Sequence, residues 1–290
     1  MNLSPAQLTH YEEHGYLVLG GMFTATEIAT LRKHARHDLD TDSPRRVHEA
    51  GSGLVRATHG AHLVTPFFHD LVRMPRLVGL AEQVVGPDVY VHQFKINAKA
   101  ALGGEVWQWH QDSYFWRHED GLRERSAVNI LIHLDEVDEF NGPLLLIPGS
   151  HRYGDLPAEE IDEVPEGEGW RTTVSARLKY TVDTESLRSL VDKQGIVSVK
   201  GPAGTVLLFD PAVVHGSSNN LSPYDRCLLI LSYNSSHHPL AEVPRPRPEF
   251  LASRNPVPLR PLEHDDLPQH PVDGPTLVGQ HAVAVRGIAR

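Results

Sequence analysis

The chain of 290 residues is long enough to bury a large hydrophobic core, and its 40% hydrophobic and 22% charged residues are typical of a globular protein. Its formal net charge of -10 argues against nucleic acid or an anionic membrane as the main partner, because polyanions bind basic surfaces.

The single cysteine, Cys227, rules out an intrachain disulfide and fits a reducing compartment. The N-terminal segment MNLSPAQLTHYEEHGY has neither the basic region nor the apolar region of a signal peptide. No apolar run approaches the length of a membrane-spanning helix. We therefore expect a cytoplasmic protein, monomeric or homodimeric, with no membrane partner.

Residues 1–87 show mostly helical patterns. The segments SPAQ and TATE have the form of a capping box, in which an N-cap hydroxyl and a Gln or Glu three residues later bond to the free amides at a helix start. We predict helices that begin at Ser4 and at Thr24 (the second ending near His37), a strand at 15–21, a loop at 40–53, and short helices near 66–73 and 75–85.

Short β-prone segments follow one another over residues 88–238, and turn residues separate several of them. Strands in such close succession favour a sandwich or barrel. We therefore predict a mainly β fold with flanking α-helices and a jelly-roll core. The segments are DVYVHQFKIN, EVWQWHQDSYFW, SAVNILIHLDEV, GPLLLIPGS, GIVSVK, GTVLLFD and RCLLILSYN.

An insertion at 154–195 interrupts the β pattern, with an acidic stretch at 155–170 and a later helical sequence, TESLRSLVDKQG. A long polar excursion of this kind is usually a lid or a solvated decoration. Residues 239–290 form a proline-rich tail. Because the sequence shows no fixed-period repeat and no separate second domain, we treat 1–290 as a single domain.

A histidine and an aspartate two residues apart, His110 and Asp112, lie in the aromatic segment WQWHQDSYFW. Side chains alternate along a strand, so both residues are predicted to point to the same face. His215, which follows the strand GTVLLFD, is the best candidate for a third ligand. Two imidazoles and a carboxylate on one face of an ion are typical of non-haem Fe(II) used in oxygen chemistry.

An iron ion with three open positions can bind a bidentate keto acid and still bind oxygen, and the far carboxylate of the keto acid then needs a cation. Arg226, at the start of a predicted strand, offers the planar fork that binds a carboxylate, and Ser217 offers a further hydrogen bond. Each of these residues alone is more often an ordinary loop or surface residue. It is their combination that favours a metal site.

Three stretches resemble the phytanoyl-CoA dioxygenase superfamily of Fe(II)- and 2-oxoglutarate-dependent oxygenases: HQD, NGPLLLIPGSHR and FDPAVVHGSSNNLSPYDR. The similarity covers most of residues 1–255 and is closest to the bacterial branch that hydroxylates free amino acids and related compounds, including ectoine hydroxylases and a free L-leucine hydroxylase. The chain shares Gln93, Asn97, WHxD, Trp116 and EDG with the ectoine hydroxylases. It shares YxHQFKIN, GGxxWxWHQD, EFNGP and PRPE with the leucine hydroxylase.

The resemblance implies a double-stranded β-helix that uses Fe(II), 2-oxoglutarate and O2. Phe115 stands where the ectoine enzymes have a small hydroxyl residue, so the pocket is more apolar and ectoine is disfavoured as the substrate. Arg247 matches an arginine that binds the substrate carboxylate. The implied residues are His110, Asp112 and His215 for the metal, Arg226, Ser217 and Asn97 for 2-oxoglutarate, and Gln93, Trp116, Arg247 and Phe115 for the substrate.

The implied activity is hydroxylation of an unactivated C–H bond in a small molecule, a free amino or imino acid such as leucine, proline or pipecolate, in secondary metabolism such as antibiotic biosynthesis. Asp112 favours hydroxylation over halogenation, because related halogenases lack this carboxylate. Desaturation, ring closure, a substrate other than an amino acid, and a non-catalytic metal-binding jelly-roll remain open. A zinc hydrolase is disfavoured because the sequence has no HExxH motif.

Overall fold

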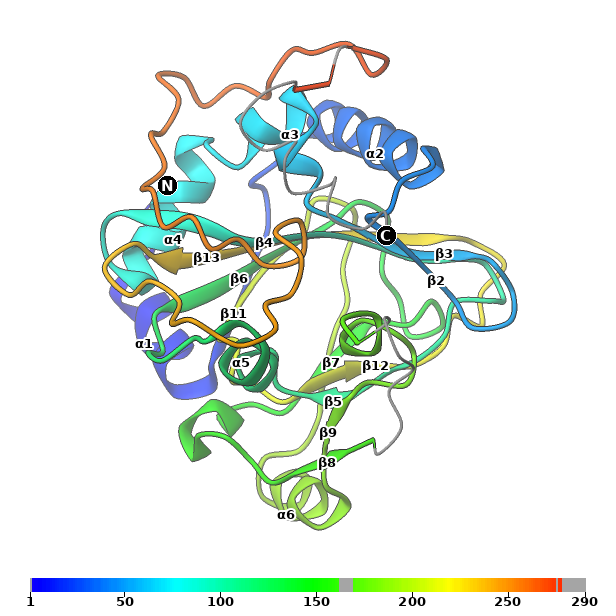
Figure 1. Cartoon of the computed structure of the whole chain (residues 1–290), viewed down its shortest axis with the longest axis vertical. Coiled ribbons are helices and arrows are strands. Elements are labelled where there is room, and N and C mark those ends of the chain that lie inside the picture. Colours follow the sequence, from blue (N-terminus) through cyan, green and yellow to red (C-terminus); the bar gives the residue numbers. More distant parts are fainter. Residues whose placement is uncertain (1, 162–168, 275, 278–290) are drawn as a thin grey trace.

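Two β-sheets face each other at the centre of the protein (Figure 1). The computed structural model describes residues 2–161, 169–274 and 276–277. Within these residues the large sheet has seven strands in the order β1-β11-β6-β13-β4-β3-β2, and the small sheet has four in the order β10-β7-β12-β5. All strand pairs are antiparallel, which confirms the predicted mainly β, jelly-roll fold.

From β4 onward the chain passes repeatedly between the two sheets, so strands far apart in sequence lie side by side. The strands of the large sheet are β1 (Tyr16–Leu19), β2 (Arg46–His48), β3 (Val55–His59), β4 (Val89–Lys99), β6 (Ala127–His133), β11 (Val206–Phe209) and β13 (Arg226–Ser235). Those of the small sheet are β5 (Trp107–His110), β7 (Leu144–Leu146), β10 (Val197–Val199) and β12 (His215–Ser217).

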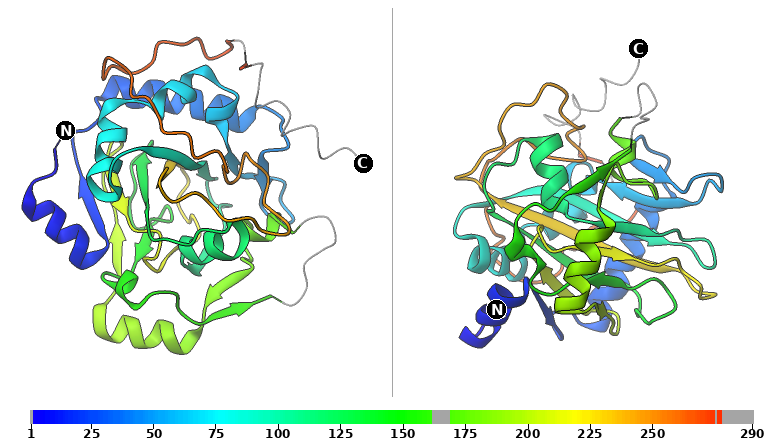
Figure 2. Two further views of the ribbon diagram at one scale, coloured as in Figure 1. Left: turned by 60° about the vertical axis from the view of Figure 1, so that its left-hand side comes forward. Right: turned by 90° about the horizontal axis from the view of Figure 1, so that it is seen from below.

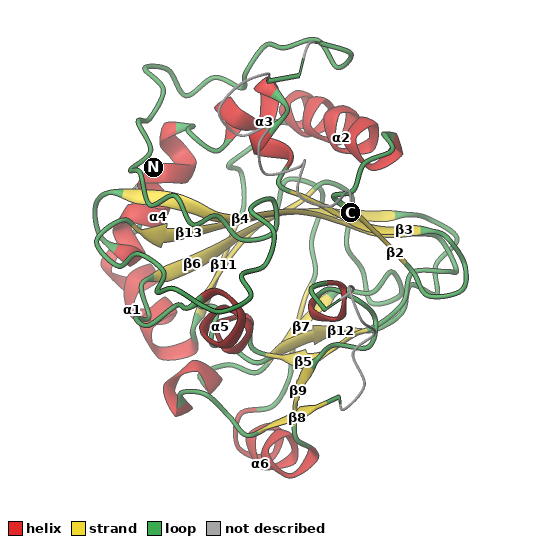
Figure 3. Ribbon diagram, viewed as in Figure 1, coloured by secondary structure: helices red, strands yellow, loops and turns green. Residues whose placement is uncertain are grey.

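Helices from the N-terminal part cover the outer face of the large sheet (Figure 3). Both predicted capping boxes are present, at Ser4 and at Thr24, and the second helix continues beyond its predicted end at His37. None of the helices in the described part of the chain has the length and apolar character of a membrane span. The helices before the core are α1 (Pro5–His14), α2 (Ala25–Asp40), α3 (Pro66–Leu71) and α4 (Pro75–Val85).

The central strands of the large sheet are apolar on both faces. In β13, Leu229 and Leu231 pack against the helices, whereas Leu228 and Ile230 pack in the space between the two sheets. This double burial explains why the strand is a continuous apolar run in the sequence. Polar side chains that point into the space between the sheets therefore need a role other than packing.

Part of the predicted loop at 40–53 is wrong. Arg46–His48 forms β2, which pairs with β3, Val55–His59, in a hairpin. The sequence does not show this hairpin because buried ion pairs, such as that of Arg56 with Glu49 at 2.8 Å, replace the apolar alternation that normally marks a strand.

The insertion at 154–195 lies beside the small sheet, where β9 contacts β5 (Figures 1 and 2). Its predicted helix is present and begins after the N-cap Asp183. Residues 162–168, in the acidic stretch, lie outside the described residues. The elements of the insertion are β8 (Ala158–Glu160), β9 (Tyr180–Val182) and α6 (Thr184–Gln194).

The proline-rich tail contains neither helix nor strand over residues 239–274. Figure 2 shows it, in orange, running along the outside of the sandwich. Backbone hydrogen bonds from Ser253 to His92 and from Leu259 to Val89, both 2.8 Å, fix it beside β4. The tail is thus held at the sheet that carries much of the site described below.

Candidate metal centre and active site

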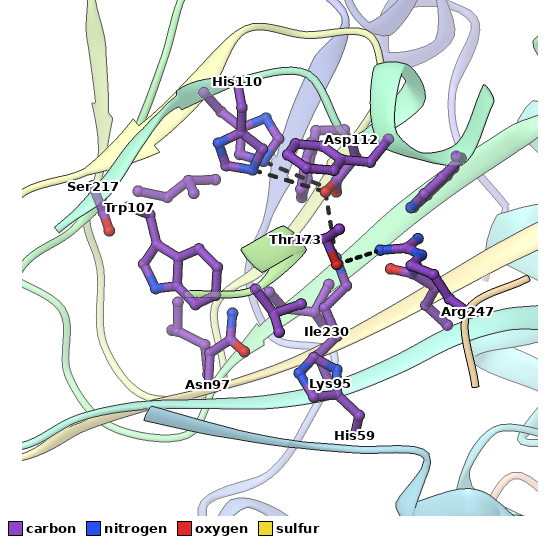
Figure 4. A pocket seen from close by; sticks show the side chains of 18 of the residues that line it. His59, Lys95, Asn97, Trp107, His110, Asp112, Thr173, Ser217, Ile230 and Arg247 are labelled. Atoms are coloured by element: carbon purple, nitrogen blue, oxygen red, sulfur yellow. Dashed lines mark hydrogen bonds and ion pairs between the residues drawn. The ribbon is translucent and has the colours of Figure 1, made fainter. Parts of the chain in front are cut away.

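Three potential metal ligands lie close together: His110, Asp112 and His215. Figure 4 shows the first two side by side. Their ligand atoms lie within 4.8 Å of one another, and all three residues are buried. The Nε2 atoms of both histidines are 3.9 Å from carboxylate oxygens of Asp112. The two histidines lie directly opposite each other on β5 and β12. This donor set fits a single divalent transition metal.

The predicted reason for this convergence was partly wrong. The strand expected at 105–116 ends at His110, and α5 (Asp112–Phe115) begins at the aspartate. The amide of Ser113 donates to the carbonyl of Pro211 at 3.0 Å, which fixes this change of direction. Asp112 therefore reaches the histidines because a helix starts there, and not because side chains alternate along a strand.

Backbone carbonyls orient the two imidazoles. Nδ1 of His110 donates to the carbonyl of Gln108 at 2.6 Å, and Nδ1 of His215 donates to that of Val213 at 2.9 Å. Each Nε2 lone pair is then free to face a metal ion. Burial lowers the pKa of His110 to about 3 and also lowers the pKa of His215, so both rings are neutral ligands at neutral pH.

Two residues that the sequence analysis did not select hold the carboxylate of Asp112. Nζ of Lys95 lies 3.4 Å from its Oδ1, and Nδ2 of Asn129 donates to its Oδ2 at 2.9 Å. Ser232 in turn donates to Oδ1 of Asn129 at 2.5 Å. Burial raises the pKa of Asp112, but Lys95 and the two imidazoles outweigh it and hold the pKa well below its usual range. The aspartate is thus an ionised, oriented ligand.

The residues predicted to bind 2-oxoglutarate line the same cavity as the metal ligands. Oδ1 of Asn97 and Oγ of Ser217 are buried and have no hydrogen-bond partner among the residues that the structure describes. Buried polar atoms rarely lack partners in folded proteins. These two atoms therefore indicate a polar ligand at this side of the cavity.

Arg226 lies at the same side, because it pairs with Lys99 on β4, two residues beyond Asn97, and it is almost fully buried. Its guanidinium donates to the backbone carbonyls of Asn141 and Gly142, in the NGPL segment. Burial lowers its pKa to about 10, so it remains charged at neutral pH. Because its carbonyl partners are uncharged, the guanidinium is available to a carboxylate. The described residues thus fit both Fe(II) and 2-oxoglutarate.

The residues predicted to contact the substrate, Gln93, Phe115, Trp116 and Arg247, also line this cavity. Figure 4 shows Arg247 on the opposite side of the cavity from Ser217. The two aromatic side chains are almost fully buried and form an apolar wall. The structure thus brings all ten predicted site residues to one cavity.

Arg247 makes a contact that the sequence did not suggest. Its Nε and Nη2 donate to the two oxygens of Asp120 at 2.8 and 2.5 Å, and its Nη1 donates to Oγ1 of Thr173 at 3.0 Å. Asp120 belongs to the EDG motif and follows α5 by way of the π-helical turn Trp116–Asp120. The arginine is therefore a fixed part of the cavity wall.

The insertion is attached to the metal centre through two glutamines that flank His110. Oε1 of Gln108 accepts from the amide of Leu178 at 2.9 Å, and Oε1 of Gln111 accepts from that of Leu156 at 2.9 Å. Nε2 of Gln111 also donates to Gly154 at 2.9 Å. Two stretches of the insertion are thus held by residues that lie within two positions of a metal ligand.

Part of the insertion also forms the cavity wall. Thr173 and Val174 line the cavity, and Val174 packs with Phe250 and Leu251 of the tail. The insertion and the tail therefore close the same side of the site. The sequence analysis missed both Lys95 and Thr173. Lys95 could have been found, because it lies between Gln93 and Asn97 at alternate positions of β4 and so shares their face. No sequence pattern reveals Thr173.

Comparisons with known proteins agree with this geometry. The family model described as phytanoyl-CoA dioxygenase (PhyH) matches residues 11–227. The chain is 41% identical over 261 residues to L-proline trans-4-hydroxylase of Streptomyces griseoviridis, covering 89% of this chain and 95% of that one. It is 35% identical over 275 residues to ectoine dioxygenase of Bordetella parapertussis, covering 90% and 86% of the two chains.

Solved structures also show similarity to an ectoine-hydroxylating enzyme. The crystal structure of EctD from S. alaskensis with 2-oxoglutarate and 5-hydroxyectoine has a TM-score of 0.77 and 33% sequence identity, and the match covers 90% of this chain and 87% of that one. The same enzyme with bound Fe has a TM-score of 0.75. The chain therefore belongs to the phytanoyl-CoA dioxygenase (PhyH) family and is an Fe(II)- and 2-oxoglutarate-dependent dioxygenase.

Proposed function

We propose that this enzyme hydroxylates an unactivated C–H bond of a free amino or imino acid, with proline as the first candidate and leucine and pipecolate next. One observation carries the proposal: the cavity has charged and polar groups on two opposite sides of the metal ligands. Arg226 serves one side, and Gln93 and Arg247 serve the other. Such a cavity suits a dicarboxylate co-substrate on the first side and a small zwitterion on the second.

Each side chain has a defined part in this proposal. The bound metal supplies oxygen activation coupled to oxidative decarboxylation of 2-oxoglutarate. Asp112, held by Lys95 and Asn129, keeps its carboxylate turned toward the metal position. Phe115 and Trp116 exclude water from the reacting C–H bond. The remaining roles are His110 and His215 as metal ligands, and Arg226, Ser217 and Asn97 as partners of 2-oxoglutarate.

Two observations favour a small substrate. The acidic net charge of -10 disfavours an acyl-CoA, which carries several phosphates. The relative of 41% identity is an L-proline trans-4-hydroxylase, which makes proline the first compound to test.

Four further expectations stay predictions. They are the organisation of residues 1–290 as one domain, the cytoplasmic location, the monomeric or homodimeric state, and a role in secondary metabolism. The absence of nucleic acid among the partners is likewise a prediction from the net charge of -10.

The test is a substrate screen. The protein is incubated with Fe(II), ascorbate and 2-oxoglutarate and with each proteinogenic amino acid, pipecolate and ectoine in turn. Succinate formation and product mass are measured. We expect succinate in proportion to a product that has gained one oxygen atom, with proline among the best substrates.

Product mass separates the alternatives. A product that has lost two hydrogen atoms would show desaturation or ring closure by the same site. Succinate formation with ectoine but with no amino acid would replace the proposed substrate class. A protein that binds Fe(II) and 2-oxoglutarate but turns over none of these compounds would contradict the proposal.

A further inference from the structure

His59, at the end of β3, lies in the wall of the active-site cavity and is almost fully buried. It pairs directly with Lys95 on β4. Residues directly opposite each other in an antiparallel ladder point to the same face, so both side chains face the cavity. Figure 4 shows the imidazole across the cavity from His110 and Asp112.

The local fold uses the backbone of His59 and leaves its ring without a partner. The amide donates to the carbonyl of Arg45 at 3.2 Å, and the carbonyl accepts from Nη1 of the same arginine at 2.7 Å. Neither ring nitrogen has a hydrogen-bond partner within the described part of the chain. An imidazole in the wall of a cavity, with both nitrogens buried and unsatisfied, is available to a ligand.

The place of His59 in the cavity indicates which ligand it meets. In the described ranges, three residues that line the cavity have buried side-chain atoms without a hydrogen-bond partner: His59, Asn97 and Ser217. Asn97 and Ser217 lie with Arg226 at the side that we assign to 2-oxoglutarate. His59 pairs with Lys95, and the charge of Arg247 acts on its ring. The ring therefore faces the side that we assign to the substrate.

The surroundings of the ring favour an anion. Burial, followed by the charges of Lys95, Arg247 and Arg45, holds the pKa of His59 well below its usual range. The ring is therefore neutral and carries one N–H donor. A substrate ammonium placed here would be repelled by the same cations, whereas a carboxylate would be attracted by them and would accept the N–H.

We propose that His59 is a specificity-determining residue that donates a hydrogen bond from its ring to the carboxylate of the amino-acid substrate. It adds a neutral, directional donor to the cationic groups of Lys95 and Arg247. This inference rests on the proposed function, because it assumes a substrate that carries a carboxylate.

The first test compares His59→Phe, which keeps a planar ring but removes both nitrogens, with His59→Gln, which keeps an N–H donor. His59→Phe should raise KM for the amino acid about tenfold or more and leave KM for 2-oxoglutarate unchanged. His59→Gln should recover part of the loss. His62→Phe is the matched control, since His62 is also buried but does not line the cavity.

The second test uses the corresponding amine, which lacks the carboxylate, as a competitive ligand. His59→Phe should weaken binding of the amino acid but leave binding of the amine unchanged. An equal loss for both compounds would show a packing role and would overturn the proposal. An unchanged KM for the amino acid in His59→Phe would overturn it as well.

A third measurement does not depend on the folding of His59→Phe or on turnover. The wild-type enzyme is loaded with Zn(II) and 2-oxoglutarate, and the ring nitrogens of His59 are followed by NMR, with the signal assigned by its loss in His59→Gln. The signal should shift with the amino acid and stay in place with the amine; no shift with the amino acid would overturn the proposal. Wild-type protein that forms no succinate with any amino or imino acid would instead refute the proposed function.

Discussion

Arg247 and Asp120 form a buried bidentate ion pair in the wall of the cavity, with donor–acceptor distances of 2.8 and 2.5 Å. Nε2 of His92 lies 3.4 Å from the same carboxylate. The pair joins the segment that follows the metal ligand Asp112 to the proline-rich tail. A substrate that contacts Arg247 thus meets a guanidinium whose orientation is set by Asp120.

Replacing Asp120 by asparagine should destabilise the protein strongly. The change leaves the charge of Arg247 buried without a counterion, which typically costs about 3–5 kcal/mol. Unfolding in urea, followed by circular dichroism, measures the difference. The exposed Asp192→Asn on α6 is the control and should differ little from wild type. A loss below about 1 kcal/mol for Asp120→Asn would contradict the structural role of the pair.

The same pair should make stability depend on acidic pH. Burial raises the pKa of Asp120, but Arg247 outweighs it and lowers the pKa to about 2. A carboxyl whose folded pKa is depressed stabilises the fold above its unfolded pKa of about 4, and this stabilisation is lost as the pH falls toward the folded value. The stability gap between wild type and Asp120→Asn should therefore shrink by about 2 kcal/mol between about pH 5 and about pH 2. A constant gap would contradict this assignment.

Asp112→Ala should abolish succinate formation while leaving the fold intact, because the site loses its anionic ligand. Co(II) titration followed by absorbance should show weaker metal binding, and circular dichroism should match wild type. Asp192→Ala on α6 serves as the control. Normal turnover by Asp112→Ala would remove this residue from the ligand set.

Arg226→Ala should raise the KM for 2-oxoglutarate about tenfold to a hundredfold, since a hydrogen bond to a charged group contributes about 1.5–3 kcal/mol. The KM for the amino acid should change less, because Arg226 lies at the other side of the cavity. Arg36→Ala, in which the removed side chain is 59% exposed, is the control. Equal effects on both KM values would argue that Arg226 shapes the whole cavity and does not bind the keto acid alone.

Gln111→Ala should loosen the insertion. The variant loses hydrogen bonds to the amide of Leu156 and to the carbonyls of Gly154 and Ala212, each of which contributes about 1 kcal/mol. Limited proteolysis should then cut within 155–170 faster than in wild type. Gln194→Ala at the end of α6 should not change the cleavage rate. Unchanged cleavage in Gln111→Ala would show that other contacts hold the insertion.

Much of the site follows from sequence because its chemistry is concentrated in recognisable positions. HxD, a distant histidine after a strand, and an arginine at the start of the next strand identify the residues that the structure gathers. The mechanism of convergence did not follow, because the start of α5 at Asp112 depends on a contact with Pro211 across the chain. Local alternation cannot reveal such a contact.

The missed parts share a physical cause. The β2–β3 hairpin is held by buried ion pairs such as Arg56 with Glu49, so it lacks the apolar pattern of a strand. His59 therefore stayed in an unassigned stretch, although it faces the cavity. Thr173 reaches the site through the fold of the insertion, and only the three-dimensional structure shows that contact.

A single strand, β4, carries residues at both of the proposed binding positions. Gln93, Lys95 and Asn97 alternate along it and line the cavity from the substrate side to the co-substrate side. At about 3.3 Å per residue, the Cα atoms of Gln93 and Asn97 are about 13 Å apart, and this spacing does not depend on the surrounding loops. Hydrogen bonds to β13 on one edge and to β3 on the other hold this strand in place. Changes in substrate preference should therefore arise through the insertion and the tail, which form another wall of the cavity, while the spacing of Gln93 and Asn97 stays constant.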